Sequence, residues 1–191
     1  MNRKLTAAIL AGFFILSLAA LTYWGLSRFG GGDTPGAGDD IAAVGTLIEA
    51  GEAILYFPGR GGRLYAERRS LSAALAGEER LQLIVEELLL GPSAENLFPT
   101  LPSHVELGGL TIDTDGTLFL DLNSKEGALR GLGSTSELLA VYSLVDTVLA
   151  NEPQARSVVL LWNGRQQPSL AGHIDTARPL VANRTLISES S

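Results

Sequence analysis

His173 and Asp175 come closest, in residue type and spacing, to a pair that could do acid–base chemistry. An imidazole and a carboxylate two residues apart can exchange a proton or share a metal ion. A serine hydrolase would also need its nucleophile on a strained turn, and the sequence contains no Gly-x-Ser-x-Gly motif. A metal site would need further ligands, and nothing in the sequence brings His104, the other histidine, close to the pair. We therefore expect His173 to brace a turn through hydrogen bonds.

A second candidate is the segment from Asp113 to Gly116, which begins like a calcium-binding loop. Such a loop needs ligands at its first, third and fifth positions and usually a bidentate glutamate at the twelfth. Counted from Asp113, the fifth residue is Thr117 and the twelfth is Ser124, so the ligand set is incomplete. Asp115-Gly116 instead predicts a tight hairpin turn, because both residue types tolerate a positive φ.

Glycines gather at Gly59, Gly61 and Gly62, and again at Gly108 and Gly109. A phosphate-binding loop would need the Walker spacing that ends in Lys-Ser or Lys-Thr, and a dinucleotide-binding fold would need its own glycine fingerprint. Neither pattern is present, so these glycines predict turns or bulges. The sequence thus predicts no catalytic, cofactor-binding or metal-ligating residue, no cofactor and no enzymatic activity.

Three arginines, Arg63, Arg68 and Arg69, lie in a segment of mixed apolar and basic residues that is typical of a strand near the edge of a sheet. Charged side chains at such an edge hinder unwanted strand pairing. The basic patch therefore predicts a solvated edge, with a docking strip for an acidic partner as the alternative.

Seven elements are expected to position these residues, in the order β-β-α-β-β-α-β. Apolar runs between turn residues indicate strands, and apolar residues three and four apart indicate helices. The expected strands cover residues 53–57, 63–71, 105–113, 117–123 and 157–162, and the expected helices cover residues 78–90 and 134–150. Two helices packed on one face of a single mixed sheet form the economical architecture, so the expected fold class is α/β of the α+β type.

The two helices carry the clearest local signals. Apolar residues from Leu81 to Leu88 form one stripe of the first helix, and Gly91 is suited to end it. In the second helix, Ser134 to Glu137 fits a capping box, in which serine and glutamate side chains bind exposed backbone N–H groups.

The N-terminal part of the chain reads as a membrane anchor. Residues 5–26 contain no charged side chain, and at about 1.5 Å per residue they match the hydrocarbon thickness of a bilayer. Arg3 and Lys4 precede them, which favours a single pass through the inner (cytoplasmic) membrane with the domain on the extracytoplasmic or periplasmic side. The alternative is a signal peptide cleaved after residues 17–19, although the apolar sequence continues past that point.

The composition favours one acidic domain beyond this anchor. The chain has 191 residues, a formal net charge of −7 and no cysteine, which excludes disulfides and thiolate metal sites. Because an acidic surface repels phosphate backbones, we expect no nucleic-acid binding. The expected organisation is a cytoplasmic N-terminus at 1–4, the transmembrane anchor at 5–26, a flexible linker at 27–50, one domain at 51–181 and a disordered tail at 182–191.

Several segments of the domain resemble, in their order and spacing, the GerMN domain family, which is named for a sporulation and germination protein. They are AILYFP from Ala53, LLLGP from Leu88, TIDTDGTLFLDLN from Thr111, SELLAVYSLVDTV from Ser136 and LAGHIDTARPL from Leu170. The resemblance implies an exported, membrane-tethered domain similar to the ring-building folds of channels that span two membranes during spore formation. It implies a role in assembly or recruitment, with no known reaction or cofactor.

Two functions follow as expectations. The first is a membrane-anchored interaction module that self-associates or recruits other envelope proteins through a sheet edge or a helix face. The second is a binding module for a cell-wall fragment or another small envelope ligand. The loops at 96–104 and 124–133 would shape its cleft, and Tyr56, Tyr65 and Trp162 would stack on the ligand, with core packing as the alternative for each aromatic residue.

Overall fold

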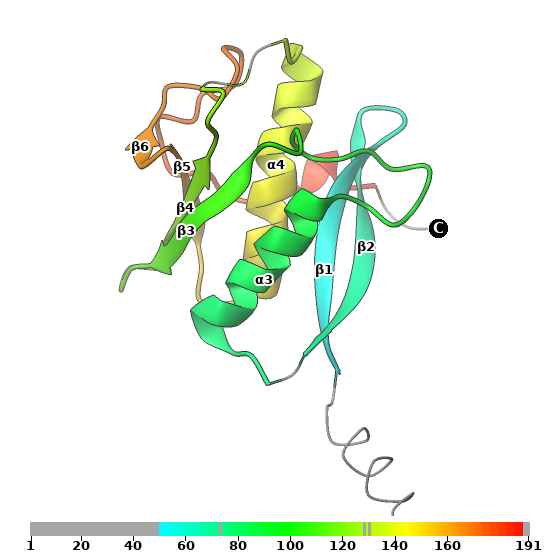
Figure 1. Cartoon of the computed structure of the whole chain (residues 1–191), viewed down its shortest axis with the longest axis vertical. Helices are drawn as coiled ribbons and strands as arrows, with labels where there is room; N and C mark the ends of the chain where they lie inside the picture. The colour runs from blue at the N-terminus through cyan, green and yellow to red at the C-terminus, as the bar shows by residue number, and fades with distance from the viewer. Residues whose placement is uncertain (1–49, 73, 128, 130, 189–191) are drawn as a thin grey trace, which may run out of the picture. The chain divides into compact units, whose positions relative to one another are not determined.

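The computed structural model describes residues 50–72, 74–127, 129 and 131–188. Within them the chain forms a mixed α+β fold with two sheets and two long helices (Figure 1). The elements are β1 (Ala50–Gly59), β2 (Arg63–Ser72), α3 (Gly77–Leu90), β3 (Glu106–Ile112), β4 (Thr117–Asn123), α4 (Ser134–Asn151), β5 (Ser157–Trp162), β6 (Arg165–Gln166) and the 3-10 helix η1 (Arg184–Leu186). The predicted β-β-α-β-β-α-β order is confirmed, and the short β6 and η1 follow it.

The strands form two sheets where the sequence predicted one. β1 and β2 make an antiparallel hairpin, and the second sheet has the strand order β3-β4-β5-β6. α3 and α4 lie between the hairpin and the larger sheet, and each helix contacts strands of both (Figure 1). The expectation of two helices on one face of a single mixed sheet is therefore wrong.

Polar side chains of α4 explain why β1 does not join the larger sheet. Ser143, Thr147 and Asn151 follow one another at four-residue spacing, so they lie on one face of the helix. The Thr147 hydroxyl accepts the Tyr56 N–H at 2.9 Å, and the Ser143 hydroxyl donates to the Tyr56 carbonyl. The Asn151 amide accepts the Ile54 N–H at 3.1 Å and donates to the Ile54 carbonyl at 2.7 Å. The helix thus occupies the positions where another strand would pair with β1.

Replacing Thr147 by valine tests this sealed edge, because valine has a similar shape and no hydroxyl. The Thr147 side chain is fully buried, so the Tyr56 N–H loses its partner where water cannot replace it. We expect the free energy of unfolding to fall by about 1–3 kcal/mol, the cost of one unsatisfied buried donor. Urea unfolding measures the change, with Thr135→Val, at an exposed position of the same helix, as the control. Equal stability of both variants would show that the hydroxyl does not seal the edge.

The larger sheet follows the alternation of its sequence. Leu118, Leu120 and Leu122 of β4 are fully buried and belong to the hydrophobic core. β4 pairs with β5 in parallel, and α4 makes the crossover that a parallel pair requires. β5 lies between β4 and β6, and its continuous apolar run suits this interior position.

Two tight turns connect neighbouring strands of the larger sheet. The Asp113 carboxylate accepts the N–H groups of Asp115 at 2.9 Å and Thr117 at 2.8 Å, and Gly116 has a φ of 82°. This segment is therefore a hairpin turn, as predicted. Asn163 forms the turn between β5 and β6 with a φ of 51°, in the left-handed region that asparagine tolerates.

The C-terminal segment, defined here as residues 180–188, connects the larger sheet to the hairpin. Leu180 and Val158 exchange two backbone hydrogen bonds of 2.8 Å, and the Ser188 N–H donates to the Leu64 carbonyl at 2.7 Å. The Leu64 side chain is fully buried. The predicted disorder of the tail is therefore wrong as far as Ser188, because backbone hydrogen bonds hold both ends of this segment.

The predicted anchor at 5–26 and the linker at 27–50 lie outside the described residues, except that Ala50 begins β1. None of the helices in the described part combines the length and the apolar character needed to cross a membrane. The described residues form one compact unit.

Candidate functional site

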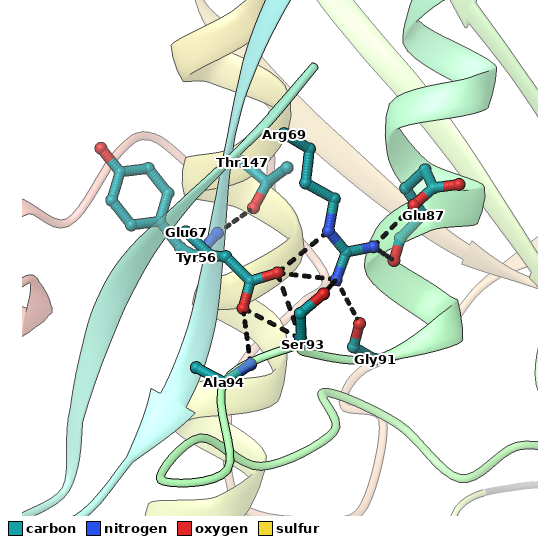
Figure 2. A network of polar contacts seen from close by, with 8 residues as sticks. All are labelled: Tyr56, Glu67, Arg69, Glu87, Gly91, Ser93, Ala94 and Thr147. Carbon is teal, nitrogen blue, oxygen red and sulfur yellow. Dashed lines mark hydrogen bonds and ion pairs between the residues drawn. The ribbon is translucent and has the colours of Figure 1, made fainter. Parts of the chain in front are cut away.

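Arg69 of β2 is the centre of a polar cluster that joins the hairpin to the end of α3 (Figure 2). Its guanidinium donates to the Glu67 carboxylate at 2.8 and 3.0 Å and to the Glu87 carboxylate at 2.6 Å. It also donates to the backbone carbonyls of Glu87 and Gly91, where the helix dipole favours a cation. The Arg69 and Glu67 side chains are only 15% and 14% exposed. At Arg69 the predicted solvated basic patch is therefore wrong, because carboxylates and carbonyls surround the charge.

The Glu67 carboxylate extends the cluster to the loop after α3. It accepts the N–H groups of Ser93 and Ala94 at 3.0 and 3.1 Å. Burial by itself would raise the pKa of Glu67, but the Arg69 guanidinium and these two N–H groups outweigh burial and hold the pKa below its usual value. The Arg69 guanidinium also lies 5.5 Å from the centre of the Phe57 ring, within the range of a cation–π contact. The cluster thus fixes β2 against α3 and the loop that follows it.

The other two arginines of the predicted patch lie apart from Arg69. Arg68 makes an exposed ion pair with Glu52 at 2.7 Å, and the Arg63 guanidinium donates to the Thr185 carbonyl at 3.1 Å. Successive side chains of a strand point to opposite faces, so Arg68 and Arg69 cannot share one surface. Between Arg68 and Arg69, only Arg68 is the solvated charge that the sequence predicted.

The outer edge of β2 pairs with the C-terminal segment at Leu64 and has no partner strand beyond it among the described residues. The backbone N–H and carbonyl groups of Ile54 and Tyr56 in β1 point to α4. In an antiparallel pair, the backbone groups of the residues opposite them, Arg68 and Ala66, therefore point away from β1. Among the described residues, no hydrogen bond is made to the outward N–H and carbonyl groups of Ala66 and Arg68, or to those of Ser70, the next outward-facing residue of β2. Within the described residues, the outward backbone groups of Ala66, Arg68 and Ser70 thus have no hydrogen-bond partner, while α4 seals the other edge of the hairpin.

Glu137 of α4 is a fully buried carboxylate that holds the loop at 169–174. Its Oε1 accepts the Ala171 N–H at 2.7 Å, and its Oε2 accepts the His173 N–H at 2.7 Å. Burial by itself would raise the pKa of Glu137, but these N–H groups and the His173 ring outweigh burial and lower the pKa. The predicted capping box is wrong, because Gly133 is the N-cap and makes no side-chain bond, while Glu137 turns to the loop.

His173 braces this turn, as predicted, but its partner is Glu137. The ring Nδ1 lies 2.9 Å from Glu137 Oε2. Asp175 instead accepts the Ala177 N–H at 2.9 Å. The structure therefore does not pair the imidazole with the carboxylate two residues away.

Asp146 is a second buried carboxylate of α4 and is 3% exposed. Its Oδ1 accepts the Asn183 N–H at 2.9 Å, and its Oδ2 is buried with no hydrogen-bond partner in the described part of the chain. Burial raises the pKa of Asp146 to about 6, against the opposing effects of the Asn183 N–H and the positive charge of Arg184. The pKa of the neighbouring Tyr56 phenol is raised by burial and by the charge of Asp146, with Arg184 and Arg68 opposing.

The raised pKa of Asp146 should make stability fall as the pH rises through about 6. The folded protein binds a proton there that the unfolded chain has already released, so protonation favours the fold below that pH. We expect the free energy of unfolding to be about 1 kcal/mol larger at pH 5 than at pH 7.5. Below pH 4.5 the lowered pKa values of Glu67 and Glu137 reverse the trend, since their bonds are lost on protonation. Urea unfolding across this range should show a flatter slope above pH 5 for Asp146→Asn; an unchanged slope would contradict the assignment.

A polar cavity of about 760 Å³ opens beside the turns at one end of the larger sheet. Its lining residues are His104, Glu106, Asp121, Asn123, Ser124, Lys125, Glu126, Asn163 and Gly164. His104 comes from the first predicted cleft loop, and residues 124–126 come from the second. The expectation that these two loops border one cleft is confirmed.

The aromatic residues predicted to stack on a ligand do not line this cavity. Trp162 is buried in the core, and its Nε1–H donates to the Gly127 carbonyl at 3.1 Å. The Tyr65 hydroxyl donates to the Arg60 carbonyl at 3.1 Å, and Tyr56 lines a different cavity. The predicted stacking platform is therefore absent from the cleft, and core packing, the alternative, holds for Trp162.

Glu137 and Asp146 are not among the site residues that the sequence predicted. A signal was available, because α4 is apolar on nearly every side and such a helix is buried all round. A charged residue inside a buried helix must find partners. Which partners it finds depends on segments far along the chain, here the loop at 169–174 and the C-terminal segment.

The profile of one family, Germane, described as sporulation and spore germination, matches residues 54–168. This match covers more than half of the chain. No curated protein matches it.

The solved structures that are similar to the chain include three with the following identities, coverages and TM-scores. The first GerMN domain of the sporulation protein GerM from Bacillus subtilis is 18% identical, with coverage of 70% of this chain and 98% of that domain and a TM-score of 0.56. The tandem GerMN domains of the same protein give 18% identity, coverage of 74% and 48%, and a TM-score of 0.54. A protein from Clostridium perfringens described as a lipoprotein gives 23% identity, coverage of 71% and 89%, and a TM-score of 0.50. At these low identities the structural similarity shows a shared fold alone, and this chain spans about half of the tandem structure.

Proposed function

This chain belongs to the Germane family of sporulation and spore germination, and we propose that its GerMN domain is a non-catalytic interaction module of a bacterial envelope assembly. One observation carries the proposal, namely the contrast between the two edges of the hairpin. α4 side chains seal β1, while the outward backbone groups of Ala66, Arg68 and Ser70 on β2 have no hydrogen-bond partner in the part of the chain that the structure describes. An open edge is a template for strand addition by another chain.

The surroundings of β2 support this role. The Arg69 cluster holds β2 against α3, so an incoming strand would meet an edge that is already ordered. Preorganisation of this kind reduces the entropy lost on binding. The Arg68 side chain is exposed at the centre of the edge and would favour a partner strand that carries an acidic residue.

The proposal places the module at the cytoplasmic membrane, with residues 5–26 as its anchor and the domain on the extracytoplasmic side. The charge-free apolar segment behind Arg3 and Lys4 supports this placement. Similarity to a Clostridium perfringens protein described as a lipoprotein also favours a tethered domain.

A non-catalytic role fits the position of the best acid–base candidate. His173 directs its Nδ1 to the buried Glu137, and both residues hold the backbone of the loop at 169–174. The hydrogen bond to Glu137 therefore gives the imidazole a structural role in holding this loop.

Blocking the β2 edge tests the assembly proposal. Ala66→Pro removes an N–H that faces away from β1, so it should spare the hairpin and prevent strand addition. Ala66→Thr keeps the N–H and is the control. Analytical ultracentrifugation of the full chain in detergent, alone and with envelope extract, should show association for the parent and for Ala66→Thr and a loss for Ala66→Pro. A parent chain that stays monomeric and captures no envelope protein would refute the proposal.

The polar cavity favours a second candidate function, a binding module for a small polar envelope ligand such as a cell-wall fragment. Its lining carries donors and acceptors from three separate loops, which is typical of a site for a hydroxyl-rich ligand. A thermal-shift screen with defined cell-wall fragments tests it, because a bound fragment stabilises the folded state. Stabilisation that Asn123→Ala abolishes would support this function, and no stabilisation by any fragment would refute it.

A further inference from the structure

A groove of about 480 Å³ lies between the last turn of α3 and the segment that leads into β3. We call it the α3–β3 groove, and its lining residues are Glu86, Leu89, Leu90, Ser103, Val105, Glu106 and Leu107. No residue of β2 lines it, so it is distinct from the edge proposed for strand addition. It adjoins the polar cavity at Glu106, which lines both.

Leu90 gives the groove an apolar side chain that is almost free of the fold. It is 81% exposed, which makes it the most exposed large apolar side chain in the described part of the chain. A lone exposed leucine is ordinary on a protein surface, but this one borders a groove that is itself lined by apolar side chains. Val105 is buried there, and Leu89 and Leu107 are partly buried against the core. An apolar side chain of a partner would therefore leave water on entering the groove.

Both sides of the groove are held by hydrogen bonds. The Arg69 guanidinium donates to the carbonyls of Glu87 and Gly91 and so fixes the last turn of α3. On the other side, the Val105 N–H donates to the Pro102 carbonyl at 3.0 Å. A groove with ordered walls loses little entropy when a partner binds, so it is suited to recognition.

Two carboxylates give the groove a negative charge. Glu86 and Glu106 are exposed, and neither makes an ion pair within the described ranges. The neighbouring Glu87 differs, because the Arg69 guanidinium neutralises it at 2.6 Å. The described lining contains no lysine or arginine. The charges of Glu86 and Glu106 are therefore available to a positively charged partner.

The adjoining polar cavity extends the same sign of charge. Its lining adds the carboxylates of Asp121 and Glu126, against the single lysine Lys125. A positively charged segment would thus be attracted along the whole surface from Glu86 to Glu126.

We propose that the α3–β3 groove binds a segment of a protein partner in which apolar side chains are flanked by lysine or arginine. The apolar side chains would enter the groove, and the flexible cationic groups would reach the carboxylates beside it. The charge disfavours other occupants. Anionic lipids and nucleic acids would be repelled, and a second copy of this chain brings a formal net charge of −7. The proposal uses no group of the β2 edge and is independent of strand addition.

Fluorescence anisotropy with defined peptides tests the proposal on the full chain, held in nanodiscs of phosphatidylcholine, with empty discs as the blank. The probe is a short labelled peptide of alternating leucine and lysine with blocked ends. One comparison peptide has serine in place of every leucine, and another has glutamine in place of every lysine. We expect saturable binding of the probe that weakens as salt is added, and about tenfold or more weaker binding of both comparison peptides.

Leu90→Ser is the variant that separates the apolar contact from general stability. Because Leu90 is so exposed, the protein should stay folded while binding of the leucine–lysine peptide weakens about tenfold or more. Val181→Ser is the matched control, since Val181 is 62% exposed and lies outside the groove. It should bind the peptide like the parent.

A double variant tests the charge. Glu86→Gln with Glu106→Gln should weaken binding and remove most of its salt dependence. Glu79→Gln with Glu95→Gln has the same net charge, changes exposed residues outside the groove and should bind like the parent.

Four results would each overturn the proposal. They are no binding of the leucine–lysine peptide by the parent, equal binding of the glutamine peptide, unchanged binding by Leu90→Ser, and association of the discs with one another that Leu90→Ser abolishes while no peptide binds. The last result would assign the groove to a second copy of this chain.

Discussion

Replacing Glu137 by alanine should lower the free energy of unfolding by about 3 kcal/mol and release the loop at 169–174. The carboxylate is fully buried. It accepts hydrogen bonds of 2.7 Å from the backbone N–H groups of Ala171 and His173, and it also contacts the His173 ring. Its removal leaves these donors without their partner at a partly buried position, and hydrogen bonds to a charged group are among the stronger ones. Urea unfolding measures the stability, and amide hydrogen exchange at Ala171 and His173 reports the release of the loop.

A second histidine–glutamate pair in the chain supplies the matched control. His104 and Glu126 lie 3.5 Å apart, but the Glu126 side chain is 70% exposed. An exposed pair contributes little, so Glu126→Ala should change stability by less than about 1 kcal/mol. A similar loss in both variants would contradict the view that burial and backbone donors, rather than the ion pair, make Glu137 important. Glu137→Gln should also be destabilising, because its amide N–H₂ would face another donor.

Replacing Arg69 by alanine should lower the free energy of unfolding by about 2–4 kcal/mol. The substitution leaves the Glu67 carboxylate, 14% exposed, without its counterion and leaves the carbonyls at the end of α3 without a donor. It also removes the cation over the Phe57 ring. Because the guanidinium donates in several directions at once, Arg69→Lys should recover only part of the loss. Chemical unfolding of the three proteins in parallel measures these effects.

The neighbouring arginine of the same strand is the control for Arg69. Arg68 pairs with Glu52 at 2.7 Å, but these side chains are 65% and 58% exposed. Arg68→Ala should therefore change stability by less than about 1 kcal/mol, and high salt should erase the difference. If the Arg68 and Arg69 variants lost equal stability, the cluster around Arg69 would contribute no more to the free energy of unfolding than an exposed ion pair.

The Arg69 variant also bears on the proposed function. β2 is connected to α3 through this cluster. Loss of the cluster should therefore loosen β2, the strand that would accept the partner strand. We expect Arg69→Ala to weaken self-association or partner capture even under conditions where the domain stays folded. Unchanged association in a folded Arg69→Ala protein would mean that the edge does not depend on this support.

The local structure of the domain could be predicted from its sequence because it depends on neighbouring residues. The alternation of Leu118, Leu120 and Leu122, the apolar spacing in α3 and the Asp-Gly turn all act within a few residues. Such signals specify which segments become strands and helices and which side chains enter the core. The order of elements and the resemblance to GerMN domains follow from the same information.

Only the tertiary structure decided how these elements meet. Ser143, Thr147 and Asn151 look like ordinary polar positions of a helix until β1 lies beside them, and that contact divides one expected sheet into two. Arg69 and Glu137 take their partners from segments that are remote in sequence. A hydrogen bond or ion pair between distant segments depends on where the whole backbone places its groups, so local residue preferences determine the elements while long-range packing determines the site.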